Sequence, residues 1–219
     1  MLYALGDPVS FVLLVLAFVV TATLSGWCSA LACTRVGLAE PGRSRPDPRR
    51  HLDPFGAVGA AVAGPGWART VELPAHRRGA GVALAVLTGP LVVLAVGLGA
   101  LAGFGAAYGP VPGTVSLLQS GAGPLPIGQE AWLLGGLMAT WVGALSLVPL
   151  PPLPGGQALF ALAPRTQGWQ KAHLQLVERN IGIAVLLALL LVPLGGSTAL
   201  LPAVLGRVLD PLVRAVSGG

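Results

Sequence analysis

Four long stretches of this 219-residue chain contain no charged side chain, and they constrain the fold more than any other feature. A charge at the centre of a bilayer costs about 2.5–3.5 kcal/mol on insertion scales, and a helix needs about 20 apolar residues to cross. The charge-free stretches are residues 8–34, 79–129, 131–164 and 180–206. We therefore predict an all-α membrane protein, a single polytopic domain over residues 1–219. Its four transmembrane spans are expected at about residues 10–34, 81–107, 131–150 and 181–201.

The composition excludes the main soluble classes. Hydrophobic residues make up 54% of the chain and charged residues 10%, against about 25% charged residues in soluble proteins. The net charge of +5 does not indicate nucleic-acid binding, because only 5% of the residues are aromatic and the basic residues are not interleaved with stacking rings. The lipid bilayer is therefore an expected partner, and nucleic acid is not.

The basic residues are unevenly distributed between the loops, which predicts an orientation. Residues 35–78 hold eight arginines, residues 154–179 add three basic side chains, and residues 108–130 have none. By the positive-inside rule, the loops at 35–80 and 154–179 are cytoplasmic in a multi-pass protein of the cell membrane. The C-terminal tail departs from this rule because it carries Arg207 and Arg214, and apolar residues at helical spacing there predict a short interfacial helix.

The arginine-rich loop also contains an apolar segment, residues 55–66, made of small residues and glycines. Twelve residues cannot cross a bilayer as a helix. Backbone that enters a membrane without crossing is tolerated only where protein or a cavity satisfies its polar groups. We therefore predict a re-entrant or interfacial segment here.

Five short motifs follow one another in a fixed order along the first 156 residues. They are the Arg35–Gly37 turn, His51-Leu52-Asp53-Pro54-Phe55-Gly56, Gly66-Trp67-Ala68-Arg69, Thr88-Gly89-Pro90, and the proline-rich run from Val148 to Gly156. Together, over about residues 10–160, they resemble the compact bacterial form of the site-2 protease family of intramembrane zinc metalloproteases.

The resemblance implies an H-E-x-x-H zinc motif on the first helix and a ligand Asp in the later proline-rich motif. The family's spacing places these positions on Ser25, Gly26 and Ser29, and on Pro154. Ser146 stands where the later family motif has Asn. Zinc in proteins takes thiolate, imidazole or carboxylate ligands, so these degenerate positions predict no catalytic residue, no metal site and no cofactor. If the frame is intact, restoring them as His, Glu, His and Asp is expected to return zinc binding.

Two other interpretations of the first helix remain. Cys28 and Cys33 lie five residues apart, about 140° around a helix, so they do not converge on one metal, although a zinc site rebuilt around Cys28 is an alternative. We favour a small-residue face for close helix packing, formed by Ser25, Gly26, Ser29, Ala30 and Cys33. A serine nucleophile is disfavoured, because no predicted span holds a base that would activate Ser25, Ser29, Ser116 or Ser146.

The three histidines all fall in predicted cytoplasmic loops. For His51 two interpretations stay open, namely a structural turn beside the family's active site and a headgroup-level histidine bonded to backbone. His76, beside Arg77 and Arg78, and His173, near Lys171, predict solvated or lipid-facing basic patches.

These observations lead to one functional prediction and two alternatives. The prediction is a catalytically inactive pseudoprotease that binds other transmembrane proteins or a protease relative. The first alternative is an active intramembrane metalloprotease with an unusual site. The second is a transporter or channel component, against which the charge-free spans count.

Overall fold

The computed structural model describes residues 7–38, 45–73, 77–111, 113–120, 125–164, 166–179, 181–192 and 199–219. Within these ranges the chain forms helices and no strand, apart from one isolated antiparallel bridge between Leu52 and Ala68. The predicted all-helical fold is confirmed.

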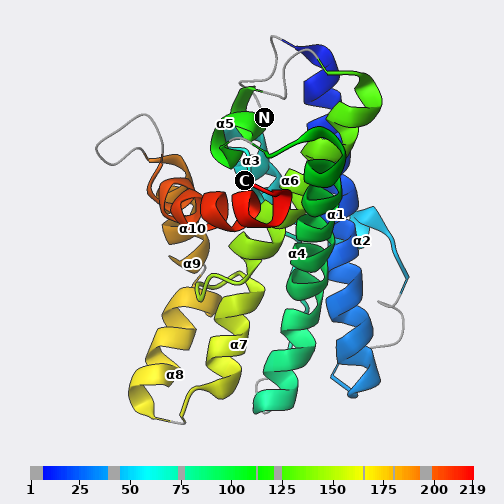
Figure 1. Ribbon diagram of the computed structural model, residues 1–219. Helices are drawn as coiled ribbons and strands as arrows, with labels where there is room; N and C mark the ends of the chain where they lie inside the picture. Colours follow the sequence, from blue (N-terminus) through cyan, green and yellow to red (C-terminus); the bar gives the residue numbers. More distant parts are fainter. Residues whose placement is uncertain are drawn as a thin grey trace.

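Two helices, α1 (Pro8–Arg35) and α4 (Ala80–Tyr108), run side by side along the length of the molecule (Figure 1). Asp7 caps α1 by accepting hydrogen bonds from the backbone N–H groups of Val9 and Ser10, and Pro8 occupies the first turn, where no N–H is needed. Both helices are long and apolar enough to cross a membrane. They match the first two predicted spans within about two residues.

The third long helix, α6 (Ile127–Ser146), is displaced from the predicted span at 131–150. It begins four residues earlier than predicted. It also ends four residues earlier, because Pro149 prevents its continuation. Glu130, expected in a loop, therefore lies in its first turn. Although it has 20 residues, α6 is not among the described helices that are both long and apolar enough to cross a membrane on their own. It packs against both of them and is buried around most of its circumference, so few of its side chains need to face lipid.

The predicted fourth span at 181–201 is not one helix in the described residues. The helix α9 (Ile181–Leu191) has 11 residues and rises about 16 Å, half of a bilayer core. A new helix, α10 (Leu200–Ser217), begins at the end of the predicted span. The segment Gln167–Val177 and α9 together are apolar enough for one span that is bent by 66°, which gives two candidate spans, or three if this pair is counted.

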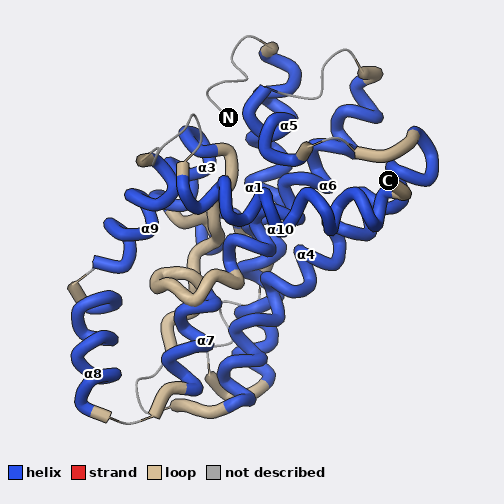
Figure 2. Tube along the Cα trace, turned by 60° about the vertical axis from the view of Figure 1, so that its left-hand side comes forward, coloured by secondary structure: helices blue, strands red, loops and turns tan. Residues whose placement is uncertain are grey.

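The amphipathic helix α10 lies crosswise to α4 and packs against it (Figures 1 and 2). Its Asp210 accepts hydrogen bonds from both the backbone N–H and the hydroxyl of Thr114, at the start of α5 (Thr114–Ser120). Gly105 of α4 lies so close to the backbone of Ser217 that a Cβ would be 2.3 Å from its carbonyl oxygen. The C-terminal helix therefore docks on the protein and does not only lie on a membrane surface.

The predicted apolar segment forms α3 (Pro54–Ala63), preceded by α2 (Pro48–His51). These two helices pack alongside α1, not beyond its C-terminal end. A Cβ on Gly66 would be 2.8 Å from the ring of Phe18, near the middle of α1. Residues 54–66 thus run back along the bundle, and the re-entrant or interfacial segment expected from the sequence stays a prediction.

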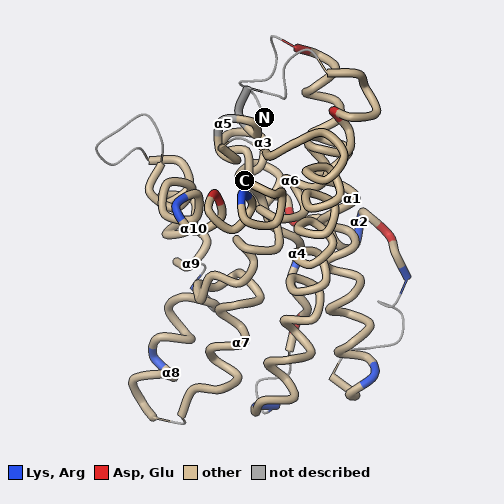
Figure 3. The backbone as a smooth tube through the Cα atoms, viewed as in Figure 1, with Lys and Arg blue, Asp and Glu red and all other residues tan. Residues whose placement is uncertain are grey.

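The remaining helices form the lower part of the molecule in Figure 1: α7 (Pro154–Leu162), α8 (Gln167–His173) and the π-helical continuation η3 (Leu174–Glu178). Figure 3 shows Lys and Arg at this lower end, where α1 ends at Arg35 and α4 follows Arg77 and Arg78, and acidic residues at the upper end. We call the lower end the basic end.

Two carboxyl groups meet one hydroxyl at the opposite end. Ser10 is fully buried, and its hydroxyl contacts Asp7 Oδ2 at 2.7 Å and the carboxylate of Glu130, which is 4% exposed. This cluster links the first turn of α1 to the first turn of α6. Hydrogen bonding from the Ser10 hydroxyl lowers the pKa of Asp7 below its ordinary value.

The lowered pKa of Asp7 predicts a specific loss of stability in acid. A carboxyl with a depressed folded-state pKa contributes stability above its unfolded pKa, near 4, and that contribution is lost as the pH falls through the folded-state value. We expect the melting temperature in detergent to fall more steeply below pH 4 for the wild type than for Asp7→Asn, which keeps the helix cap without the charge. Parallel pH profiles for the two proteins would contradict this role of Asp7.

Candidate functional site

The three positions to which the resemblance assigns the zinc motif lie together on the buried face of α1. Ser25 is 1% exposed, Ser29 is 5% exposed, and Gly26 is buried between them. Ala30 and Cys33 continue the same face. The small-residue face predicted from the sequence is therefore the face that α1 buries against its neighbours.

Gly89 of α4 makes the closest approach to this face. A Cβ on Gly89 would be 1.9 Å from the backbone oxygen of Ser25 and 2.4 Å from the Ser29 hydroxyl oxygen. No side chain larger than hydrogen fits between the two backbones. The glycine of the Thr88-Gly89-Pro90 motif thus sets how close α1 and α4 can lie.

Ser29 supplies a hydrogen bond that Pro90 removes from the backbone of α4. In an α-helix the carbonyl of Val86 would accept a hydrogen bond from the N–H of residue 90, and proline has none. The Ser29 hydroxyl donates to the Val86 carbonyl oxygen at 2.7 Å and accepts from the Gly89 N–H at 3.1 Å. Ser29 is therefore a structural bridge between the two helices.

Removing this bridge is expected to destabilise the protein. Ser29→Ala would leave the buried Val86 carbonyl without a donor, at a cost of about 1–2 kcal/mol. Unfolding of the purified protein in mixed detergent and SDS micelles would measure the loss.

A double-mutant cycle separates this hydrogen bond from simple packing. Pro90→Ala supplies an N–H for Val86 within α4, so Ser29→Ala should cost clearly less in that background. An equal cost in both backgrounds would show that Ser29 does not compensate for the proline.

Gly26 lies against the ring of His51. A Cβ on Gly26 would be 2.9 Å from both the Cβ and the Nδ1 of His51. The histidine is 4% exposed, its Nε2 is 3.0 Å from the backbone oxygen of Arg45, and its own carbonyl accepts from the Arg69 N–H at 2.7 Å. The structure therefore shows a buried histidine that is bonded to backbone and packed on Gly26, and both interpretations of His51 stay predictions.

The two motifs on either side of α3 pack against each other. Leu52 pairs with Ala68 in the isolated bridge, and a Cβ on Gly56 would be 2.2 Å from the carbonyl oxygen of Trp67. Trp67 is fully buried. The glycine in one motif and the tryptophan in the other therefore form one packing unit that positions His51 on α1.

Pro154 is the first residue of α7, which packs mainly on α4 and shares a buried cluster with Ala30 and Cys33 of α1. Its fixed φ and missing N–H suit the start of a helix. The two glycines that follow allow close backbone contact, since a Cβ on Gly155 would be 2.2 Å from the carbonyl oxygen of Leu147 and one on Gly156 would be 2.4 Å from the backbone of Leu150. The proline-rich run thus folds tightly onto the end of α6.

The described residues offer no cluster of three His, Cys, Asp or Glu side chains that would hold a metal ion. Cys28 is half-buried, Cys33 is buried, and both are free thiols. Ser146 is buried, and its hydroxyl has no hydrogen-bond partner in the described part of the chain. A serine hydroxyl is not among the usual zinc ligands.

The other two histidines differ in what the structure records. His76 lies outside the described residues. His173 stacks edge-on against Phe160, with ring centres 5.1 Å apart. It therefore contributes to the packing of α8 on α7 at the basic end.

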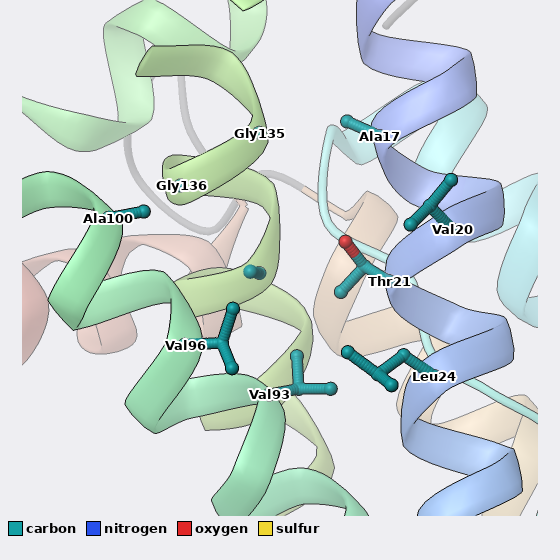
Figure 4. Close-up of a pocket in the computed structure, with 10 residues that line it drawn as sticks. Ala17, Val20, Thr21, Leu24, Val93, Val96, Ala100, Gly135 and Gly136 are labelled. Atoms are coloured by element: carbon teal, nitrogen blue, oxygen red, sulfur yellow. The ribbon is translucent and has the colours of Figure 1, made fainter. Parts of the chain in front are cut away.

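A cavity of about 180 Å³ lies between α1, α4 and α6. Figure 4 shows Thr21 and Leu24 of α1 facing Val93 and Val96 of α4 across it. Small residues from α1, α4 and α6 complete the lining, namely Ala17, Ala100, Gly135, Gly136 and Ala139. Two rim residues are exposed, Val20 by 65% and Val96 by 52%, so the cavity opens at the surface of the bundle. We call it the α1/α4/α6 cavity.

The sequence analysis missed the contact between Ser10 and Glu130. It placed Glu130 in a loop because the third span was expected to start at residue 131. The signal that would have revealed the earlier start is Pro126, which favours a helix beginning immediately after it.

Comparisons of the chain with protein-family models, with curated proteins and with solved structures gave no match. The geometry of the described residues is therefore the basis for the functional argument that follows.

Proposed function

We propose that this chain is a four-span membrane protein on a site-2-protease-like frame, without zinc-dependent hydrolysis, that binds the transmembrane helices of other membrane proteins. The four spans are α1, α4, α6 and the bent pair formed by Gln167–Val177 and α9. The twenty residues of α6 rise about 30 Å, enough to cross within the shelter of its neighbours. The basic end faces the cytoplasm, following the positive-inside rule.

The absence of hydrolysis is supported by what occupies the family positions. Ser29 is used to satisfy the Val86 carbonyl, Gly26 is covered by His51, and Ser25 lies against Gly89. The side chains at positions 25, 26 and 29 offer neither a base nor a zinc ligand, and the nearby His51 has its Nε2 bonded to the backbone oxygen of Arg45. A water molecule there would be neither activated by a metal nor deprotonated by a carboxylate.

The observation that carries the binding proposal is a contrast along α1. Around Ser25 the helix is closed by backbone contacts, whereas one turn earlier, at Thr21, it lines the α1/α4/α6 cavity. Transmembrane helices associate through small residues that let backbones approach closely. The alanines and glycines of this cavity leave room for an apolar side chain of a partner helix. The partner can be another membrane protein or an active protease relative.

Photo-crosslinking in native membranes tests this proposal. A benzophenone amino acid is placed at Val20, on the rim of the cavity, or at Val12, which is 52% exposed on the same helix but does not line it. We expect Val20, and not Val12, to cross-link to a transmembrane segment of another membrane protein.

A matched pair of variants locates the contact. Ala100→Phe fills the cavity from α4, while Ala95→Phe adds the same ring to an exposed position of that helix. The Val20 cross-link should disappear only with Ala100→Phe. Equal cross-linking from both sites, or cross-links to lipid alone, would contradict helix binding.

Stoichiometric zinc lost with Cys28→Ala, or chelator-sensitive substrate cleavage, would contradict the lack of hydrolysis.

A further inference from the structure

A second, larger cavity of about 710 Å³ lies at the basic end, between α7, the α8–η3 helix and the extended segments at 70–73 and 77–78. This volume falls within the range of about 300–1,000 Å³ that is typical of ligand-binding pockets. We call it the basic cavity. Its walls are of two chemically different kinds, which restricts what it can hold.

One wall carries cations. Arg77 and Arg78 line the cavity, and Arg78 is oriented by a hydrogen bond from its Nη1 to the carbonyl oxygen of Ala163, at 3.4 Å. His173 also lines the cavity, edge-on against Phe160. Glu72 is the one carboxylate among the lining residues, so the two guanidinium groups leave a net positive charge. Arginine is the preferred side chain for binding phosphate oxygens, because its planar donors match their geometry.

The other wall is apolar and leads toward a helix without polar side chains. Phe160, Leu174 and Val177 line it, together with Ile183 from the first turn of α9. The whole of α9 has the sequence Ile-Gly-Ile-Ala-Val-Leu-Leu-Ala-Leu-Leu-Leu. A ligand with its charge at the arginines can therefore continue along α9 as a hydrocarbon chain.

We propose that the basic cavity binds a phospholipid with an anionic headgroup, its phosphate at Arg77 and Arg78 and its acyl chains along α9. A free phosphate would leave the apolar wall unused, and an uncharged lipid would leave the net positive charge of the lining unbalanced. Basic pockets at the cytoplasmic side of transmembrane helices suit anionic headgroups in this way. This proposal does not depend on the pseudoprotease function, since it concerns other residues.

Lipid binding by the full-length protein in dodecyl maltoside micelles tests the proposal. Fluorescently labelled phosphatidylglycerol is the probe, and phosphatidylcholine with the same acyl chains is the zwitterionic control. We expect phosphatidylglycerol to bind more tightly than phosphatidylcholine. The double variant Arg77→Gln/Arg78→Gln should raise the Kd for phosphatidylglycerol about thirtyfold, because it removes two arginines near the headgroup. The matched control Arg207→Gln/Arg214→Gln removes the same charge from α10 and should leave its Kd unchanged.

A second variant keeps the test decisive if the double variant fails to fold. Leu174, which is 43% exposed, lines the apolar wall, and Leu174→Glu places a carboxylate where the proposed acyl chains would lie. It should also weaken phosphatidylglycerol binding. Equal losses with both arginine pairs would overturn the proposal. So would equal binding of phosphatidylcholine, displacement by inorganic phosphate alone, or displacement by a soluble polyglutamate peptide.

Discussion

Gly89→Ala is expected to destabilise the protein by about 3 kcal/mol or more, the upper range for overpacking a tightly packed site. The added Cβ would be 1.9 Å from the backbone oxygen of Ser25, and a backbone atom cannot move aside as the end of a flexible side chain can. The helices α1 and α4 would have to separate along their contact, and the hydrogen bonds of Ser29 would lengthen. Unfolding in mixed detergent and SDS micelles measures the loss.

Gly99→Ala on the same helix is the matched control. Nothing lies within 4 Å of a Cβ at this exposed glycine, so the variant should be as stable as the wild type or slightly more stable, because alanine favours the helix. If Gly89→Ala were tolerated as well as Gly99→Ala, the close approach of α1 and α4 would be wrong.

Gly26→Glu is the second substitution for which we expect a large effect, a loss of about 3 kcal/mol or more. It introduces the residue found in the active family, but its Cβ would be 2.9 Å from His51, and its carboxylate would be buried without a zinc-bound partner. Gly81→Glu is the control, since a Cβ at that exposed helical position meets nothing within 4 Å. Melting temperatures in detergent compare the two variants.

His51→Gly should partly rescue Gly26→Glu, because it removes the ring and the Cβ that fill the space. Additive losses would show that the two residues do not compete.

The same packing changes the expectation for restoring the zinc motif. The fourfold variant with His, Glu, His and Asp at positions 25, 26, 29 and 154 should not hold stoichiometric zinc while His51 covers position 26. Metal analysis of the purified variant, with and without His51→Gly, measures this directly.

The sequence predicts the two helices whose ends carry clear signals. Asp7 and Pro8 mark the start of α1, Arg35 and Gly37 its end, and glycines bound α4 on both sides. The third helix was misplaced because the absence of charge alone does not fix a boundary within a long apolar stretch. The prediction of the fourth span as a single helix was wrong. The sequence signal for a break is the Pro193-Leu194-Gly195-Gly196 run, which the search for charge-free stretches did not take into account.

The site was less predictable than the fold, for a physical reason. Spacing along α1 is enough to place Ser25, Ser29 and Cys33 on one face. It does not reveal which residue covers Gly26, because His51 lies 25 positions further along the chain and reaches α1 through the pairing around Leu52 and Ala68. Similarly, Pro90 predicts an unpaired carbonyl at Val86, but only the three-dimensional packing identifies Ser29 as its donor.

The separation of charge between the two ends of the bundle has an electrical consequence. With the basic end in the cytoplasm, Arg35, Arg77 and Arg78 sit at the negative side of an energised membrane, and Asp7 lies at the positive side. An inverted molecule would place each of these charges against the potential, at about 2.3 kcal/mol per charge for every 100 mV. In the proposed orientation, the resting voltage of a cell membrane would thus favour this insertion direction, and depolarisation would weaken that preference.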